Sequence, residues 1–126
     1  MYVLDTDVSI DYMRGNQKVV EFLDSLVDVR LTTITAAELF FGANSIDKIK
    51  ITNSLKDFLQ KFNMLPFQLW DAIMFGKIKA DLKRKGTPIE DMDVMIAAIA
   101  LSYGFTVITR NLKHFQKIKD LKLITI

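Results

Sequence analysis

The chain has 126 residues, enough for one compact domain with a hydrophobic core and too few for two. Half of the residues are hydrophobic and a quarter are charged, and no apolar stretch approaches the roughly 20 residues that a membrane-spanning helix needs. The lack of cysteine excludes disulfides, thiol catalysis and structural zinc. No basic region followed by an apolar segment opens the chain, so we expect no signal peptide, no membrane contact and a cytoplasmic setting.

The net charge of +2 hides an uneven distribution of basic residues. Such stripes contact a polyanion or form a solvated helix face, and composition leaves both interpretations open. The two clusters are Lys77, Lys79, Lys83, Arg84 and Lys85, then Arg110, Lys113, Lys117, Lys119 and Lys122.

Short β-prone runs alternate along the chain with helical patterns. The predicted strands are 1–4, 29–32, 63–65, 106–109 and 123–126. The predicted helices include a short one around 35–41, a long one that reaches 61 or 62 after the possible caps Asn44 and Ser45, and one over 69–85. This order predicts a single α/β domain, residues 1–126, with a parallel β-sheet of four to five strands and helices on both faces.

Polar side chains follow two of the predicted strands directly. Asp5 and Asp7 come after the first strand, and Arg110 and Asn111 come after the strand at 106–109. Function in open parallel sheets gathers at the carboxyl ends of the strands, where the strand order reverses. If the two strands are neighbours, these side chains meet.

Three acids stand among apolar residues: Asp5 after a strand, and Glu38 and Asp93 within helical patterns. Asp5 also suits a helix N-cap, and Glu38 also suits a solvent-facing position. Buried carboxylates are costly without a cation, and their oxygen atoms favour hard ions such as Mg²⁺ or Mn²⁺. Asp91 falls in a first helical turn, where an acid favours the helix dipole. It is also a candidate for orienting the ligands of a metal site or for binding the metal itself, as are Asp7 and Asn111.

Two other residues have a structural interpretation from the sequence. His114 lies on a basic segment and is expected to be an exposed surface residue. Trp70 follows Pro66 and Phe67 closely, so we expect it to pack in a cluster at the start of a helix.

Four pieces of the chain, in order, resemble the PIN-domain ribonucleases of the VapC toxin family. They are Met1-Tyr2-Val3-Leu4-Asp5-Thr6-Asp7, Thr35-Ala36-Ala37-Glu38-Leu39, Asp93-Val94-Met95-Ile96-Ala97-Ala98 and Thr109-Arg110-Asn111-Leu112-Lys113-His114-Phe115. The resemblance implies a metal-dependent endoribonuclease that uses Mg²⁺ or Mn²⁺, a VapB-type antitoxin partner and a homodimer.

By position, the resemblance makes Asp5, Glu38 and Asp93 the catalytic metal ligands. Asn111 stands where many relatives carry Asp, so it offers a carbonyl oxygen without charge. Asp7 stands where Asn or Ser is commoner, and its carboxylate compensates for Asn111 or caps a helix.

The substrate implied by the resemblance is RNA, which we expect to cross the sheet edge. Arg110 and Lys113 would then contact phosphates rather than bases, and so position the RNA without selecting its sequence.

Two alternatives belong to other classes. The Asp5-Thr6-Asp7 sequence resembles the nucleophile motif of haloacid-dehalogenase phosphatases, but the later lysine and acidic pair of that family are not evident. A catalytically silent RNA-binding or protein-binding domain of the same fold would show no metal-dependent activity.

Overall fold

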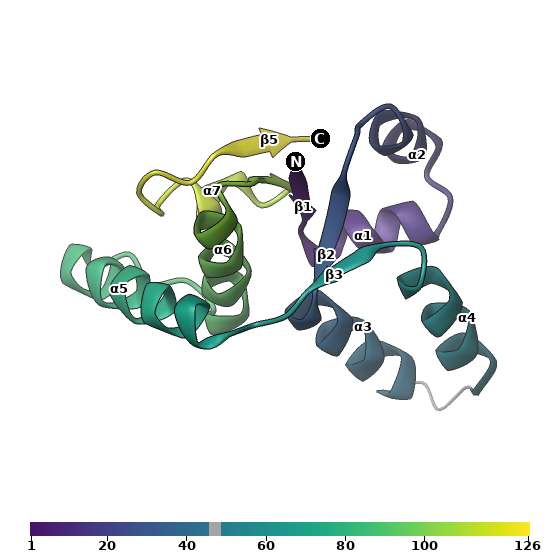
Figure 1. Ribbon diagram of the computed structural model, residues 1–126, viewed down its shortest axis with the longest axis horizontal. Helices are drawn as coiled ribbons and strands as arrows, with labels where there is room; N and C mark the ends of the chain where they lie inside the picture. Colours follow the sequence, from purple (N-terminus) through teal and green to yellow (C-terminus); the bar gives the residue numbers. More distant parts are fainter. Residues whose placement is uncertain (46–48) are drawn as a thin grey trace.

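The computed structural model describes residues 1–45 and 49–126, and the described residues form one parallel sheet flanked by helices (Figure 1). The strands are β1 (Tyr2–Leu4), β2 (Val29–Thr32), β3 (Asn63–Leu65), β4 (Thr106–Thr109) and β5 (Leu123–Thr125). The helices are α1 (Thr6–Met13), α2 (Gln17–Asp24), α3 (Thr33–Ser45), α4 (Ile49–Leu59), α5 (Leu69–Lys85), α6 (Asp91–Tyr103) and α7 (Leu112–Phe115). No helix among the described residues is long and apolar enough to cross a membrane.

The predicted fold class, the five strands and the helix at Leu69–Lys85 are confirmed. The predicted caps Asn44 and Ser45 are wrong, because both residues lie in the last turn of α3. Their side chains donate back to the carbonyl oxygens of Phe40 and Phe41, at 2.9 and 2.8 Å. Short polar side chains also bond to the carbonyl oxygen four residues earlier within a helix, so their presence alone does not mark a helix start. The next helix, α4, also ends earlier than expected, at Leu59.

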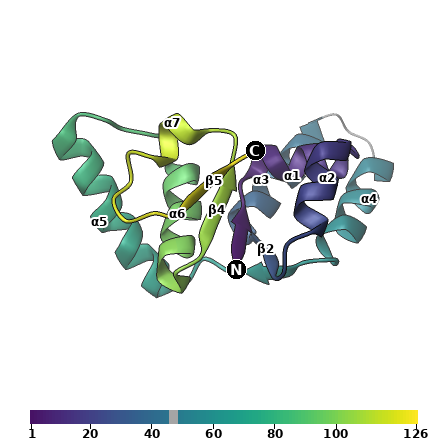
Figure 2. The ribbon, with the colours of Figure 1, turned by 90° about the horizontal axis from the view of Figure 1, so that it is seen from above.

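The sheet separates two layers of helices and two apolar clusters. Val3 of β1 and Val107 of β4 pack with α5 and α6, whereas Leu4 and Ile108 pack with α1 to α4. Neighbouring residues of a strand point to opposite faces, so β1 and β4 each supply both clusters. Figure 2 shows α5 and α6 on one side of the sheet and α1 to α4 on the other.

The strand order is β3-β2-β1-β4-β5, so the order reverses between β1 and β4. These two strands pair in register, with Leu4 opposite Ile108. The ladder continues one step further, because the Asp5 backbone N–H donates to the Ile108 carbonyl oxygen at 2.9 Å. The fold thereby places the residues that follow β1 beside the end of β4, at the point where parallel sheets commonly bind ligands.

Candidate active site

Asp5 forms the centre of the site and is almost fully buried, at 4% exposure. Its Oδ1 accepts a hydrogen bond from the Thr6 backbone N–H at 2.7 Å, as expected of the residue that caps α1. Its Oδ2 accepts a second bond from the Thr109 hydroxyl at 2.8 Å. The capping and site interpretations of Asp5 are therefore compatible, because the two carboxylate oxygens serve different elements.

Glu38 reaches the same place from α3 through threonine hydroxyls. Thr6 Oγ1 donates to Glu38 Oε1 at 2.7 Å and lies 3.0 Å from Thr35 Oγ1. A hydroxyl has a single proton, so Thr35 is the donor in the contact with Thr6. The helical spacing of Thr35 and Glu38, three residues apart, puts both on the face of α3 that meets α1.

Asp93 arrives from the first turn of α6 and contacts the short helix α7. Its Oδ2 lies 3.1 Å from His114 Nδ1, and the same ring nitrogen lies 2.7 Å from the Asn111 amide nitrogen. Asn111 also donates its backbone N–H to Thr109 Oγ1 at 2.8 Å. His114 is therefore not the free surface residue that its position in a basic segment suggested.

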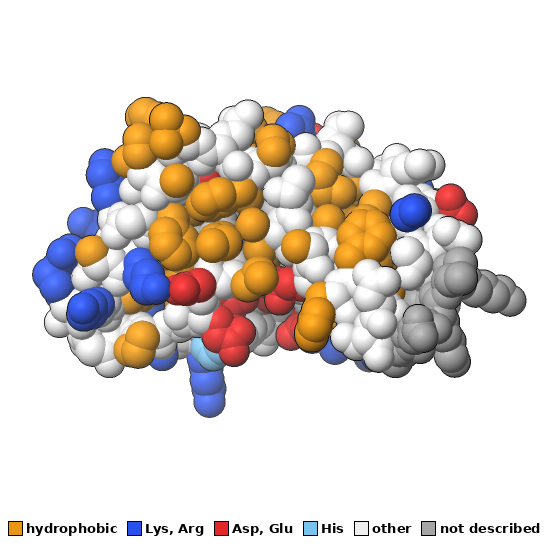
Figure 3. All heavy atoms as spheres, turned by 90° about the horizontal axis from the view of Figure 1, so that it is seen from below, with side chains coloured by type: hydrophobic (Ala, Val, Ile, Leu, Met, Phe, Trp, Pro, Cys, Tyr) orange, Lys and Arg blue, Asp and Glu red, His pale blue; other side chains and the backbone are white. Residues whose placement is uncertain are grey.

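These contacts form one continuous hydrogen-bonded network across the carboxyl end of the sheet. It runs from Asp93 through His114, Asn111 and Thr109 to Asp5, and then through Thr6 to Glu38. Figure 3 shows the acidic side chains gathered on this face beside the single histidine of the chain. Residues from four separate segments thus converge on one place.

The electrostatics of the three acids show that like charges are crowded there. Burial raises the pKa of Asp5 to about 6, against the hydrogen bonds from Thr109 and Thr6, and the charges of Asp93 and Asp7 raise it further. Burial is also the main cause that raises the pKa of Glu38. The hydrogen bond from Thr6 opposes it, and the charges of Asp93, Asp7 and Glu90 add to it. These interactions require the carboxylates to lie near one another.

The pKa of Asp93 is raised as well. Burial is the largest cause, the hydrogen bond and charge of His114 oppose it, and the charges of Glu90 and Asp7 add to it. Among the described residues, no lysine or arginine forms an ion pair with any of the three acids. In the part of the chain that the structure describes, the site is therefore a group of buried and partly buried carboxylates whose charge no lysine or arginine offsets.

The acids around the site differ in whether their charges act on Asp5, Glu38 and Asp93. Asp7 is exposed, yet its charge acts on all three central acids, so it lies at the rim of the site. Asp91 is half-exposed and pairs with Lys79 at 2.8 Å, and it is not among the main charges acting on the three acids. The charge of Glu90, the N-cap residue of α6, acts on Glu38 and Asp93.

The two basic candidates lie beside the site. Arg110 forms an ion pair with Asp11 of α1 at 2.9 Å, and its side chain remains about half exposed. Lys113 is exposed on α7. Arg110 follows β4 directly and Lys113 lies on the next helix, so they border the network without joining it.

Sequence reasoning missed the hydroxyls that hold the acids. Thr6, Thr35 and Thr109 orient the carboxylates, although Thr after a strand or at a helix start is too common to stand out. The one available signal was position, because Thr6 and Thr109 end or follow the two strands at the switch point.

Oxygen donors from carboxylates, hydroxyls and an amide suit Mg²⁺ or Mn²⁺ better than softer metals. In the described part of the chain, however, no three acidic or histidine side chains stand close enough together to form a ready ligand cluster. The carboxylates are instead held by donors such as Thr6 and Thr109, and each oxygen keeps a further lone pair. The donor set fits a hard cation, and small carboxylate rotations would be needed to close around it.

A parallel sheet with crowded acids at its switch point defines an α/β protein with a candidate centre for metal-assisted chemistry. The chain belongs to the PIN domain family, which it matches over residues 2–121. It is 31% identical over 124 residues to "Ribonuclease VapC2" of Haemophilus influenzae, which covers 96% of this chain and 94% of the relative. It is also 31% identical over 125 residues to "tRNA(fMet)-specific endonuclease VapC" of Salmonella typhimurium, covering 97% and 95%.

The fold agrees with a solved structure of VapBC-1 from nontypeable Haemophilus influenzae. The TM-score is 0.88 at 32% identity, and the match covers 98% of this chain and 96% of that chain. The family that the sequence motifs suggested is thereby confirmed.

Proposed function

We propose that this chain is a metal-dependent endoribonuclease, the toxin of a VapBC-type pair, acting on RNA in the cytoplasm through one catalytic unit, residues 1–126. The observation that carries the proposal is the network that joins Asp5, Glu38 and Asp93 at the switch point of the sheet. The names of its relatives, which are ribonucleases and an endonuclease, support the same reaction class.

In this proposal Asp5, Glu38 and Asp93 hold Mg²⁺ or Mn²⁺, with Asp7 at the rim. A divalent ion bound there would activate a water molecule and stabilise charge on phosphate oxygens. The charge of Asp93 raises the pKa of Asp5 and of Glu38, and the charge of Asp7 raises the pKa of all three acids. A cation would therefore relieve a repulsion already present in the protein. Asp91 is paired with Lys79, which supports giving it no direct part.

The protein's own groups fix the geometry of the reaction. Thr109 and the Thr6 backbone hold Asp5, and the Thr6 hydroxyl holds Glu38, so these carboxylates do not have to be ordered when RNA arrives. Arg110 and Lys113 would contact phosphates on the side of β4. The ion pair with Asp11 orients the Arg110 guanidinium and leaves it partly exposed.

An antitoxin partner is supported by an apolar groove that begins at Glu38. The groove has a volume of about 290 Å³ and lies between α1, α3 and α4. Its lining consists of Ile10, Met13, Arg14, Glu38, Leu39, Gly42, Ala43 and Leu55. A VapB-type segment with apolar anchors fits this chemistry, and it would cover the site from the side of Glu38. One solved neighbour is described as a member of the VapBC family of toxin-antitoxin systems.

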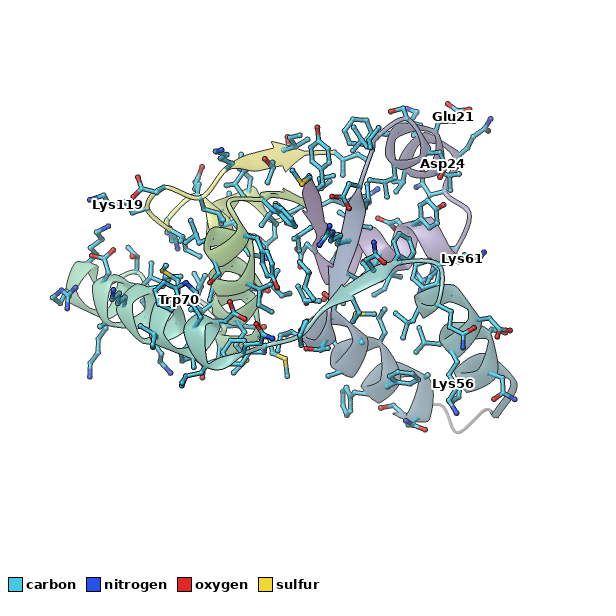
Figure 4. All side chains as sticks on the ribbon, in the orientation of Figure 1. Glu21, Asp24, Lys56, Lys61, Trp70 and Lys119 are labelled. Carbon is cyan, nitrogen blue, oxygen red and sulfur yellow. The ribbon has the colours of Figure 1, made fainter. Side chains whose placement is uncertain are left out.

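A homodimer is supported by apolar side chains left exposed at the start of α5. Leu69 and Trp70 are 79% and 65% exposed, and Ile73 one turn further along α5 is exposed as well. Phe41 of α3 and Met92 of α6 are two other exposed apolar side chains. The expected packing of Trp70 at the helix start is therefore wrong, because the side chain is 65% exposed. The first turn of α5 is held by Asp71, whose Oδ2 accepts the Gln68 backbone N–H. Figure 3 shows hydrophobic side chains spread over the face beside the acids, and Figure 4 marks Trp70 on α5. A second copy of the chain would cover such a surface.

The oligomeric state tests the dimer separately from the chemistry. Trp70→Glu should convert a dimer to a monomer in light scattering, whereas Val27→Glu, at an equally apolar and exposed position, should not. Equal masses for both variants and the parent chain would contradict this interface.

The nuclease itself is tested with purified protein, labelled RNA and a titration of Mg²⁺ or Mn²⁺. Cleavage products that appear only with metal support the proposal. Hydrolysis of a phosphate monoester without RNA cleavage would instead favour the phosphatase alternative, and RNA binding without any metal-dependent cleavage would favour a silent binding domain.

A further inference from the structure

His114 is the residue of the site for which the proposed reaction has no role. The ring lies on α7, which the fully buried side chain of Phe115 anchors to the core. One ring atom, Nδ1, is close to two different side chains: 3.1 Å from Asp93 Oδ2 and 2.7 Å from the Asn111 side-chain amide. The imidazole is about two-fifths exposed, and the Asp93 side chain is much less so.

The two contacts make opposite demands if the amide nitrogen faces the ring. An ionised carboxylate only accepts, so the contact with Asp93 needs a proton on Nδ1. An amide nitrogen only donates, so the contact with Asn111 would need a lone pair on the same atom. The two ends of an amide have nearly the same shape, and the hydrogen-bond network decides which end lies where. With the Asn111 oxygen turned toward His114, both neighbours accept from one Nδ1–H.

We infer that His114 is a positioning residue of the metal site, whose Nδ1–H is shared between Asp93 Oδ2 and the Asn111 amide oxygen. Asp93 then presents its other oxygen, Oδ1, to the ion. Asn111 supports the site through His114 and is not itself a ligand. The inference rests on the proposed role of Asp93 as a metal ligand.

The hydrogen-bonded network explains how His114 would affect metal binding. Asp93 lies in the first turn of α6, whereas the backbone N–H of Asn111 bonds to Thr109, which in turn bonds to Asp5. His114 contacts both parts of the site and links them through its ring nitrogen Nδ1. Partners that hold a ligating carboxylate in one orientation typically change metal affinity by about 10 to 100-fold when they are lost.

The test measures Mn²⁺ binding by calorimetry, without RNA, in the full chain and three variants. His114→Phe keeps a ring but no donor, and it should weaken Mn²⁺ binding by about 10 to 100-fold. His114→Asn places an amide nitrogen where Nδ1 stood and should restore most of the affinity. His114→Gln places its amide nitrogen further out, near the position of Nε2, and should bind as weakly as His114→Phe. Thermal unfolding without metal confirms that each variant is folded.

Nuclear magnetic resonance shows directly which imidazole nitrogen of His114 carries the proton. The chain has a single histidine, so with any affinity tag removed the imidazole nitrogen signals of ¹⁵N-labelled protein come from His114 alone. In the Mg²⁺-loaded protein at alkaline pH, the proton should reside on Nδ1. A proton found only on Nε2, an unchanged affinity in His114→Phe, or an affinity as low in His114→Asn as in His114→Phe would each overturn the inference. Failure of the parent chain to bind Mn²⁺ would overturn both this inference and the proposed function.

Discussion

Thr109 donates its hydroxyl proton to Asp5 Oδ2 at 2.8 Å, although the two residues are 104 positions apart in the chain. The same hydroxyl oxygen accepts the backbone N–H of Asn111. One fully buried side chain therefore connects the ends of β1 and β4 at the switch point of the sheet.

Replacing Thr109 with Val keeps the shape of the side chain and removes both hydrogen bonds. Asp5 Oδ2 and the Asn111 N–H would lose their partner, so the free energy of unfolding should fall by about 1 to 3 kcal/mol. Urea unfolding measures the change. Thr106→Val, at the partly exposed first position of β4, is the control and should change stability much less. Equal losses in both variants would show that the effect comes from strand packing and not from this connection.

Asp5 should make the metal-free protein less stable as the pH rises. Its pKa is raised from 3.8 in the unfolded reference to about 6 in the folded protein. Between these values the folded state holds the proton more tightly, so the stability contributed by protonated Asp5 is present below the unfolded pKa and lost as the pH rises through about 6. The loss is roughly 2 to 3 kcal/mol for a shift of this size.

The variant Asp5→Asn isolates this effect, because the amide does not titrate in this range. In EDTA, its stability relative to the parent chain should increase between pH 4 and 6 and then level off. A constant difference across this range would mean that the Asp5 pKa is not raised.

Mg²⁺ or Mn²⁺ should raise the melting temperature of the protein, because an ion that binds only the folded state stabilises it by mass action. The shift should shrink in Glu38→Ala. Glu21→Ala, on α2 and far from the site in Figure 4, should retain the full shift. Identical shifts in all three proteins would place the ion away from Glu38.

Removing the charges of Arg110 and Lys113 together should weaken RNA binding and lower its salt dependence by roughly one counterion for each lost phosphate contact. The cleavage position should stay the same, since phosphate contacts do not read bases. The double variant Lys56→Ala and Lys61→Ala, at the α4 end of the molecule (Figure 4), is the matched control. A salt slope that is unchanged in the Arg110 and Lys113 variant would show that this segment faces away from the RNA.

The sequence predicted the sheet and the acids because both depend on local patterns. Short apolar runs marked the strands, and an acid such as Asp93 stood out on the small apolar face of its helix. The contacts of His114 depend on how α7 folds back over α6, which no local pattern encodes. For the same reason Trp70 was misplaced, since nothing nearby in the sequence shows whether an apolar helix start meets the core or a second molecule.

The central claim is that Asp5, Glu38 and Asp93 act as one metal-binding catalytic group, and the most direct test compares two neighbouring aspartates of α6. Asp93→Asn removes one charge from the crowded site and keeps its shape, so the protein should fold while RNA cleavage with Mg²⁺ or Mn²⁺ falls by on the order of a hundredfold or more. Asp91→Asn, whose carboxylate pairs with Lys79, should cleave at nearly the parent rate. An unchanged cleavage rate in Asp93→Asn, measured under the same metal and RNA conditions, would contradict the account.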